Sequence, residues 1–302
     1  MALINGRVRL RLRRISLLLL FIWIMPAPAA DHDPPIRIGF ASVVLSGDQA
    51  YLPRWRGYLE QKIGRSVEFK ILNSCRKATD LLHAAHLDFA WIGGYCFATT
   101  MDLGYLKLMT VPVYRGEPQH RSLIIVHRDN PSTRISDLRG QIFAFSDPDS
   151  NTGFAYPLAL IPRRESKPGE YFRQTFFTFS HAKTVRAVAA QVADAGAVDS
   201  YVWEYLASLR PDITKQTKII LRSPNFGFPP IVSRIGAEAK TVARMKDVFE
   251  TMDNDPVGRS LLAKLKLDEF RPYPPSLFNS TRWMANSLRT TRNSWPAAVT
   301  ID

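Results

Sequence analysis

The sequence predicts an α/β fold with two lobes, each a mostly parallel sheet flanked by helices, with a cleft between the lobes. Three observations support this prediction. Short apolar strands alternate with amphipathic helices, the alternation starts a second time near residue 122, and the chain crosses between the halves twice, near 114–121 and 223–230. The 302 residues, 46% of them hydrophobic, are also enough to bury two cores.

The first half alternates strand and helix from residue 36 to residue 113. We expect strands at 36–41, 67–72, 88–92 and 106–113, and helices around 51–63, 78–85 and 95–102. In a parallel sheet, the loops that follow the strands meet at one functional edge. Ser42 and Tyr95 follow the first and third strands. Ser42 is therefore a candidate ligand contact, and Tyr95 either lines the same pocket or packs in the core.

The second half repeats the pattern and ends by returning to the first. The expected strands are 122–126, 142–145, 176–179, 195–198, 219–221 and 230–232, and the expected helices are 136–140, those that open at His181 and at Asp199-Ser200, 237–252 and 256–265. Phe226 and Phe228, in the connector 223–229, either form a lid or pack inside a hinge. The proline-rich segment 271–275 is expected to end the compact part. Lobe 1 is then 31–118 with 226–302, and lobe 2 is 119–225.

The stretch 143–160 has the layout of a site for an anion. A strand leads into a turn of small polar residues, and a helix begins at Ser150, Asn151 and Thr152. The first amides of a helix lack intrahelical acceptors and lie at the positive end of its dipole, which favours phosphate, sulfate or carboxylate groups. An ordinary helix cap is the alternative. His181 and Asp199, at the starts of two later helices, are further candidate contacts, and each is alternatively a cap.

Residues 1–30 have the form of a secretory signal peptide. A basic region holds five arginines, an apolar run covers Ile15 to Met25, and small residues end it at Ala27-Pro28-Ala29-Ala30. The apolar run is shorter than the roughly 20 residues of a standard membrane span, which favours a signal peptide. An uncleaved anchor is the alternative. The formal charge of +13 includes those five arginines, which leaves +8 on residues 31–302. This excess suits an anionic ligand.

Composition also argues against several classes of function. No basic run interleaved with aromatics and no zinc-finger or RNA-recognition signature is present, so a nucleic-acid partner is not expected. The histidines and the two cysteines, Cys75 and Cys96, lack metal-ligand spacing, and no metal or cofactor is expected. In an oxidising compartment the two cysteines either form a disulfide or remain as two free thiols.

Several segments, in their order along the chain, resemble one known family. They are Ile38-Gly39-Phe40, residues 87–93, 121–126, 137–140 and 147–153, Ser180-His181, residues 197–200, Ser223-Pro224 and residues 230–232. Together they cover about residues 36 to 275 and resemble the PhnD-like family, the phosphate, phosphite and phosphonate group of periplasmic solute-binding proteins of ABC importers. The resemblance implies the type II periplasmic-binding fold, with the ligand trapped when two lobes close.

The resemblance also implies roles for particular residues. Members of the family use a Ser-Thr-Ser turn and a histidine to bind the oxygens of the anion, and these look like Ser150, Asn151, Thr152 and His181. The carboxylates that bind an aminoalkyl group in some members have no match here, since Tyr201 and Pro229 fall at those places. Phosphate, phosphite, a methyl-type phosphonate and an unrelated small acid stay open as ligands, and an aminoalkylphosphonate is disfavoured.

The predicted function is capture of a small oxyanion in the periplasm by a monomer that delivers it to an ABC transporter permease. The alternative is a ligand sensor that presents its closed form to a membrane receptor or sensor kinase. An enzyme is not expected, because Ser150 and His181 lack the Gly-x-Ser-x-Gly elbow of a serine hydrolase.

Overall fold

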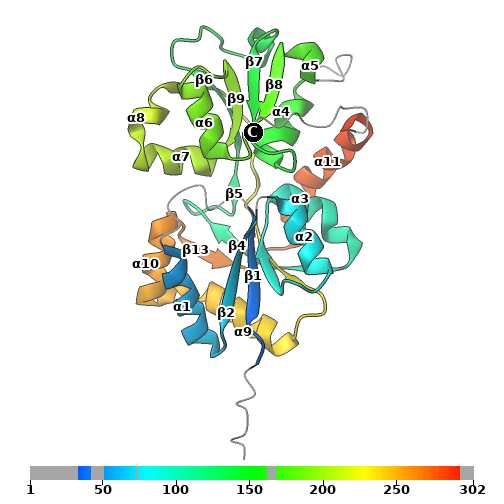
Figure 1. The fold of residues 1–302 in the computed structure, drawn as a ribbon, viewed down its shortest axis with the longest axis vertical. Helices are drawn as coiled ribbons and strands as arrows, with labels where there is room; N and C mark the ends of the chain where they lie inside the picture. The colour runs from blue at the N-terminus through cyan, green and yellow to red at the C-terminus, as the bar shows by residue number, and fades with distance from the viewer. Residues whose placement is uncertain (1–32, 42–50, 73, 162–167, 293–302) are drawn as a thin grey trace, which may run out of the picture. The chain divides into compact units, whose positions relative to one another are not determined.

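Two separate sheets organise the part of the chain from Pro34 onward (Figure 1). The structure is a computed structural model that describes residues 33–41, 51–72, 74–161 and 168–292. The predicted signal segment 1–30 and the predicted contact Ser42 lie outside these residues. Among the residues that are described, no helix combines the length and the apolar character needed to cross a membrane.

The first sheet has six strands in the order β13-β4-β12-β3-β1-β2. β1 pairs in parallel with β2 and β3, whereas β12 is antiparallel to β3 and β4, and β13 is antiparallel to β4. The predicted limits of the first, second and fourth strands are confirmed. The strands are β1 (Ile36–Ala41), β2 (Val67–Leu72), β3 (Phe89–Trp91), β4 (Leu106–Val113), β12 (Ile231–Arg234) and β13 (Glu269–Arg271).

Two of the helices around this sheet begin at polar side chains that cap them. Ser74 caps α2 by accepting the Lys77 N–H, and Asp255 caps α10 by accepting the N–H groups of Val257 and Gly258. In α1, Trp55 and Tyr58 are buried, as their helical spacing predicts. The helices are α1 (Leu52–Ile63), α2 (Cys75–His83), α3 (Gly94–Thr100), α9 (Ala239–Glu250) and α10 (Pro256–Leu265), with 3₁₀ turns η2 (Met101–Leu103) and η5 (Met252–Asn254).

The second sheet has five strands in the order β10-β6-β9-β7-β8. β7 pairs in parallel with β8 and β9, and β6 is antiparallel to β9 and β10. β8 ends two residues earlier than predicted, because Phe179 adopts a positive φ of 54° that breaks an extended strand. The strands are β6 (Ser122–His127), β7 (Ile142–Phe145), β8 (Gln174–Phe177), β9 (Ala195–Asp199) and β10 (Thr217–Arg222).

Helices pack on both faces of the second sheet (Figure 1). Two of them start at the C-terminal ends of strands that share one edge, because α6 follows β8 and α7 follows β9. Besides the turn at residues 151–155, the helices are η3 (Ile135–Leu138), α4 (Tyr156–Ala159), α5 (Pro168–Tyr171), α6 (His181–Ala189), α7 (Ser200–Leu209) and α8 (Pro211–Thr214).

The two predicted crossings pair with each other. β5 (Gln119–His120) and β11 (Phe226–Gly227) form a short antiparallel pair. Along the chain, each of these strands lies between a strand of one large sheet and a strand of the other. Phe228 is fully buried against Tyr114 and Tyr201, and Phe226 is buried beside Tyr156. Both phenylalanines therefore pack inside the molecule and do not form an exposed lid. The lobe boundaries at 118/119 and 225/226 remain a prediction.

The expectation that the compact part ends at 271–275 is wrong. The turn η6 (Pro275–Phe278) buries Phe278 against Phe97, and α11 (Asn279–Arg292) follows it. Met284 and Ala285 on α11 are buried in a cluster with Tyr95, Ala155 and Phe226. The sequence did not reveal this helix because its few apolar residues stand among polar ones.

Cys75 and Cys96 form a disulfide, which resolves the two alternatives for these cysteines. Their Cα atoms are 6.3 Å apart, at the first turn of α2 and within α3. Both helices start from strand ends at the same edge of the first sheet, so the disulfide fixes two neighbouring loops of that edge.

Candidate functional site

Strand ends and helix starts from both halves of the chain surround a cavity of about 20 Å³. Five of the predicted contacts line it, namely Ser150, Asn151, Thr152, His181 and Asp199. A cavity of this size holds about one water molecule. The other lining residues are Cys75, Gly93, Gly94, His120, Asp147, Asp149 and Pro229.

The turn after β7 continues into η4 (Asn151–Ala155), which is a π-helical turn and not the α-helix expected from the sequence. Ser150 is its N-cap and accepts the Gly153 N–H at 2.9 Å. A Cβ added to Gly153 would lie 2.5 Å from the Ser146 Cβ and 2.9 Å from the His181 Cε1. Glycine is therefore required here for His181 to approach the turn.

The amide of Asn151 is buried without a hydrogen bond. The residue is 5% exposed, and neither its Nδ2 nor its Oδ1 has a partner among the described residues. A buried polar group without a partner costs about 1–3 kcal/mol. Native proteins usually pair such groups, so an unpaired amide on a cavity wall indicates a place for a polar ligand.

His181 offers the cavity a fixed neutral donor. Its Nδ1 accepts the backbone N–H of Asp199 at 3.0 Å, so the neutral ring carries its proton on Nε2. Burial lowers the pKa of His181 to about 4, against 6.5 for an ordinary histidine, so the ring is uncharged at neutral pH. The Nε2 lies 3.4 Å from the Ser150 Oγ and can donate to that oxygen or to a ligand.

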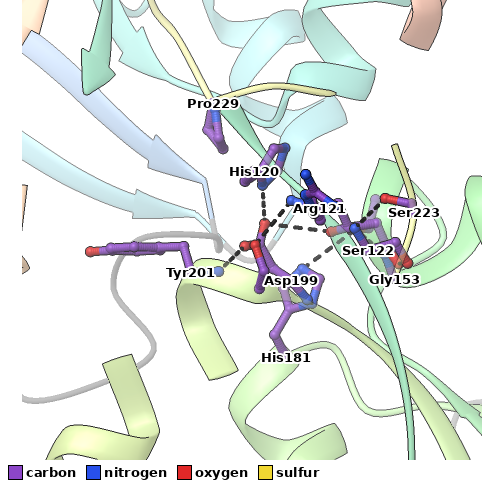
Figure 2. Close-up of polar contacts among 12 residues, drawn as sticks. His120, Arg121, Ser122, Gly153, His181, Asp199, Tyr201, Ser223 and Pro229 are labelled. Carbon is purple, nitrogen blue, oxygen red and sulfur yellow. Dashed lines mark hydrogen bonds and ion pairs between the residues drawn. The ribbon is translucent and has the colours of Figure 1, made fainter. Parts of the chain in front are cut away.

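Asp199 is the hub of the polar contacts around the cavity (Figure 2). One carboxylate oxygen caps α7 by accepting the Tyr201 N–H at 2.8 Å, and the other lies 2.5 Å from the His120 Nδ1. The Thr152 hydroxyl donates to the second oxygen at 3.5 Å. Burial would raise the pKa of Asp199, but His120 and the other donors outweigh burial and hold that pKa below its usual value. Asp199 is therefore a helix cap and part of the cavity wall.

Tyr95 does not line this cavity, and Ser42 lies outside the described residues. Tyr95 is buried with Phe226 and Met284 and lines a separate, larger groove of about 510 Å³. Arg76 and Asp149 border that groove and form an ion pair of 3.8 Å. Roles of Tyr95 and Ser42 as ligand contacts stay predictions.

Sequence reasoning missed His120. The residue is 6% exposed, and its Nε2 is buried with no hydrogen-bond partner in the described part of the chain. It lies on the crossing strand β5, 79 residues before the Asp199 to which it is bonded. The available signal was a histidine placed two residues before the start of the predicted β-strand at 122–126.

The described residues contain no group of three or more His, Cys, Asp or Glu side chains arranged to hold a metal ion. A serine-hydrolase triad is also not formed at Ser150 and His181. In a triad a carboxylate accepts a hydrogen bond from the N–H of the second ring nitrogen, whereas His181 Nδ1 is itself an acceptor from a backbone amide.

Comparison with known proteins identifies the family. Residues 49–278, about three quarters of the chain, match the family described as the periplasmic substrate-binding protein of phosphonate ABC transporters. The chain belongs to this family. It is a family of substrate-binding proteins, not of enzymes, and its members are periplasmic.

Individual relatives agree with this membership. The phosphonates-binding periplasmic protein of Escherichia coli (strain K12) is 24% identical over 276 residues, covering 88% of this chain and 80% of that protein. The binding protein component of an ABC phosphonate transporter from Pseudomonas aeruginosa has a TM-score of 0.76 at 20% identity, covering 86% and 88% of the two chains. PhnD1 of Prochlorococcus marinus (MIT 9301) in complex with methylphosphonate has a TM-score of 0.73 at 17% identity, covering 84% and 97%. The two structures show that this phosphonate-family chain has the type II periplasmic-binding fold.

Proposed function

We propose that this chain captures a small phosphorus oxyanion, such as a methyl-type phosphonate, phosphite or phosphate, in the cavity at the start of η4. The observation that carries the proposal is the pair of buried, unpartnered polar groups on its wall, the Asn151 amide and the His120 Nε2. An oxyanion would accept hydrogen bonds from the Asn151 amide, from His181 Nε2–H and from the first amides of the π-helical turn. The family membership and the methylphosphonate complex of PhnD1 agree with this ligand class.

The size and surroundings of the cavity favour ligands with a small substituent. A cavity of about 20 Å³ must widen even for phosphite. Each further heavy atom of the ligand then requires a larger displacement of the cavity wall. The neighbouring groove shares Asp149 with the cavity, and Asp149 is paired with Arg76 of the groove. Cys75 lines the cavity, and its disulfide partner Cys96 lines the groove. We therefore expect methylphosphonate and phosphite to bind more tightly than 2-aminoethylphosphonate.

We also propose that the protein delivers the bound oxyanion to a membrane partner. Residues 1–30 would direct export, and the monomeric binding protein would present its ligand-bound form to an ABC transporter permease. The paired crossings β5 and β11 are suited to act as a hinge. A ligand that contacts the η4 side and the Gly93-Gly94 side of the cavity would favour the closed arrangement by its extra affinity for that state.

Thermal unfolding of the ligand-free protein tests this proposal. Phosphate, phosphite, methylphosphonate, 2-aminoethylphosphonate and sulfate are each added in turn, with neutral solutes as controls. An anion present at about 100 times its dissociation constant adds roughly 2.7 kcal/mol to the free energy of unfolding. We expect a clear rise in Tm with a phosphorus oxyanion and none with the neutral solutes. The absence of any rise across the oxyanions would contradict the proposal.

A further inference from the structure

We propose that His120 is a proton-linked ligand contact: the buried His120–Asp199 pair takes up a proton at His120 when an oxyanion enters the cavity, and the resulting Nε2–H donates to the anion. This inference rests on the proposed function, since it assigns a specific residue and charge state to the same site. It predicts that part of the affinity depends on pH through one side chain.

The position of Asp199 determines which nitrogen of His120 faces the ligand. The Asp199 carboxylate accepts from Nδ1 at 2.5 Å, so Nδ1 carries a proton in both the neutral and the charged ring. The other nitrogen, Nε2, lines the cavity and has no partner among the described residues. A neutral ring would present a lone pair to an anion, which is repulsive, whereas an imidazolium presents an N–H donor.

The charges around the cavity explain why a proton would be needed. Three carboxylates, Asp147, Asp149 and Asp199, line the wall, and His181 is neutral because burial lowers its pKa to about 4. Arg76 lies on the far side of Asp149, at 3.8 Å, and is 70% exposed. The His120 ring also packs against Phe228, which is uncharged. Among these groups, His120 is the one that can add a positive charge beside a bound anion by taking up a proton.

The two histidines should therefore respond differently to pH. His181 donates from Nε2 at every pH above about 4 because it stays neutral there. His120 Nε2 donates only when the ring is charged. An anion that binds the charged ring better favours uptake of the proton, so the affinity gained from His120 should fall as the pH rises.

The test compares methylphosphonate affinity in the wild type and in His120→Gln between pH 5.5 and 9.5. The ionisation of the ligand itself is identical in both proteins, so it cancels in the ratio of their dissociation constants. We expect the wild type to bind about tenfold or more tightly than His120→Gln at the acidic end, with the ratio falling as the pH rises. His181→Gln is the matched control, and its ratio to the wild type should stay constant over the same range.

Calorimetry on the wild type in buffers of different ionisation enthalpy gives a second measurement that needs no variant. Over the pH range in which the affinity ratio falls, the protein should take up a fraction of a proton for each ligand bound, beyond the protons that the ligand accounts for. A flat His120→Gln ratio with no excess proton uptake, while methylphosphonate still binds, would overturn this inference and leave the proposed function intact. A wild type that binds no oxyanion at all would contradict both.

Discussion

We expect Asp199→Ala to lower the free energy of unfolding by about 3–5 kcal/mol, because it removes the acceptor of several buried donors and each buried donor left unpaired costs about 1–3 kcal/mol. Asp199 is 1% exposed and bonds His120 Nδ1, the Tyr201 N–H and the Thr152 hydroxyl. Its loss uncaps α7 and leaves the buried His120 ring without its acceptor. Denaturant unfolding of the ligand-free protein measures the change.

Asp212→Ala is the control, because Asp212 pairs with Arg210 at an exposed position and its removal should leave stability unchanged. The pH dependence gives a second check. The pKa of Asp199 is lower in the folded protein than the ordinary 3.8, so its stabilisation is present above that pH and is lost as the pH falls through the folded-state pKa. An Asp199→Ala variant as stable as Asp212→Ala at neutral pH would show that the pair does not stabilise the fold.

The second large effect concerns Asn151 and has opposite signs for binding and for stability. Replacing Asn151 with Leu should weaken oxyanion binding by about 1.5–3 kcal/mol, which is roughly 10- to 150-fold, because hydrogen bonds to a charged ligand are lost. The same change should not destabilise the ligand-free protein, and we expect it to raise the Tm, since it removes a buried amide that has no partner among the described residues.

Titration calorimetry and thermal unfolding of the same samples measure both effects. Asn254→Leu is the matched control, because Asn254 is exposed in η5 and away from the cavity, so binding should be unchanged. If Asn151→Leu binds as tightly as the wild type, the Asn151 amide is not part of the ligand site. A large loss of stability would show instead that the amide has a structural role.

Much of this site was predictable because parallel strands bring distant helix starts together. The apolar segments 36–41, 67–72 and 106–113 are strands with the predicted limits. Ser150 and His181 follow β7 and β8, Asp199 is the last residue of β9, and these three strands end at one edge. A polar residue at each of these strand ends was therefore enough to predict that they lie around one cavity.

What the sequence did not reveal depends on pairings between distant segments. His120 acquires its partner only because β5 pairs with β11 and lies beside the end of β9. The π-helical turn at Asn151 holds Gly153 close to Ser146 and His181, and this approach depends on residues distant in the sequence. Helix α11 is held by contacts with Tyr95 and Ala155, and its own sequence is mostly polar.

The central claim is that the cavity at the start of η4 is an oxyanion site, and a crystal structure of the protein with methylphosphonate tests it most directly. We predict that the phosphonate oxygens lie within hydrogen-bond distance, about 2.7–3.2 Å, of Asn151 Nδ2, His120 Nε2 and His181 Nε2. A phosphonate bound in the larger groove beside Tyr95, with Asn151 and His120 still without partners, would contradict the claim.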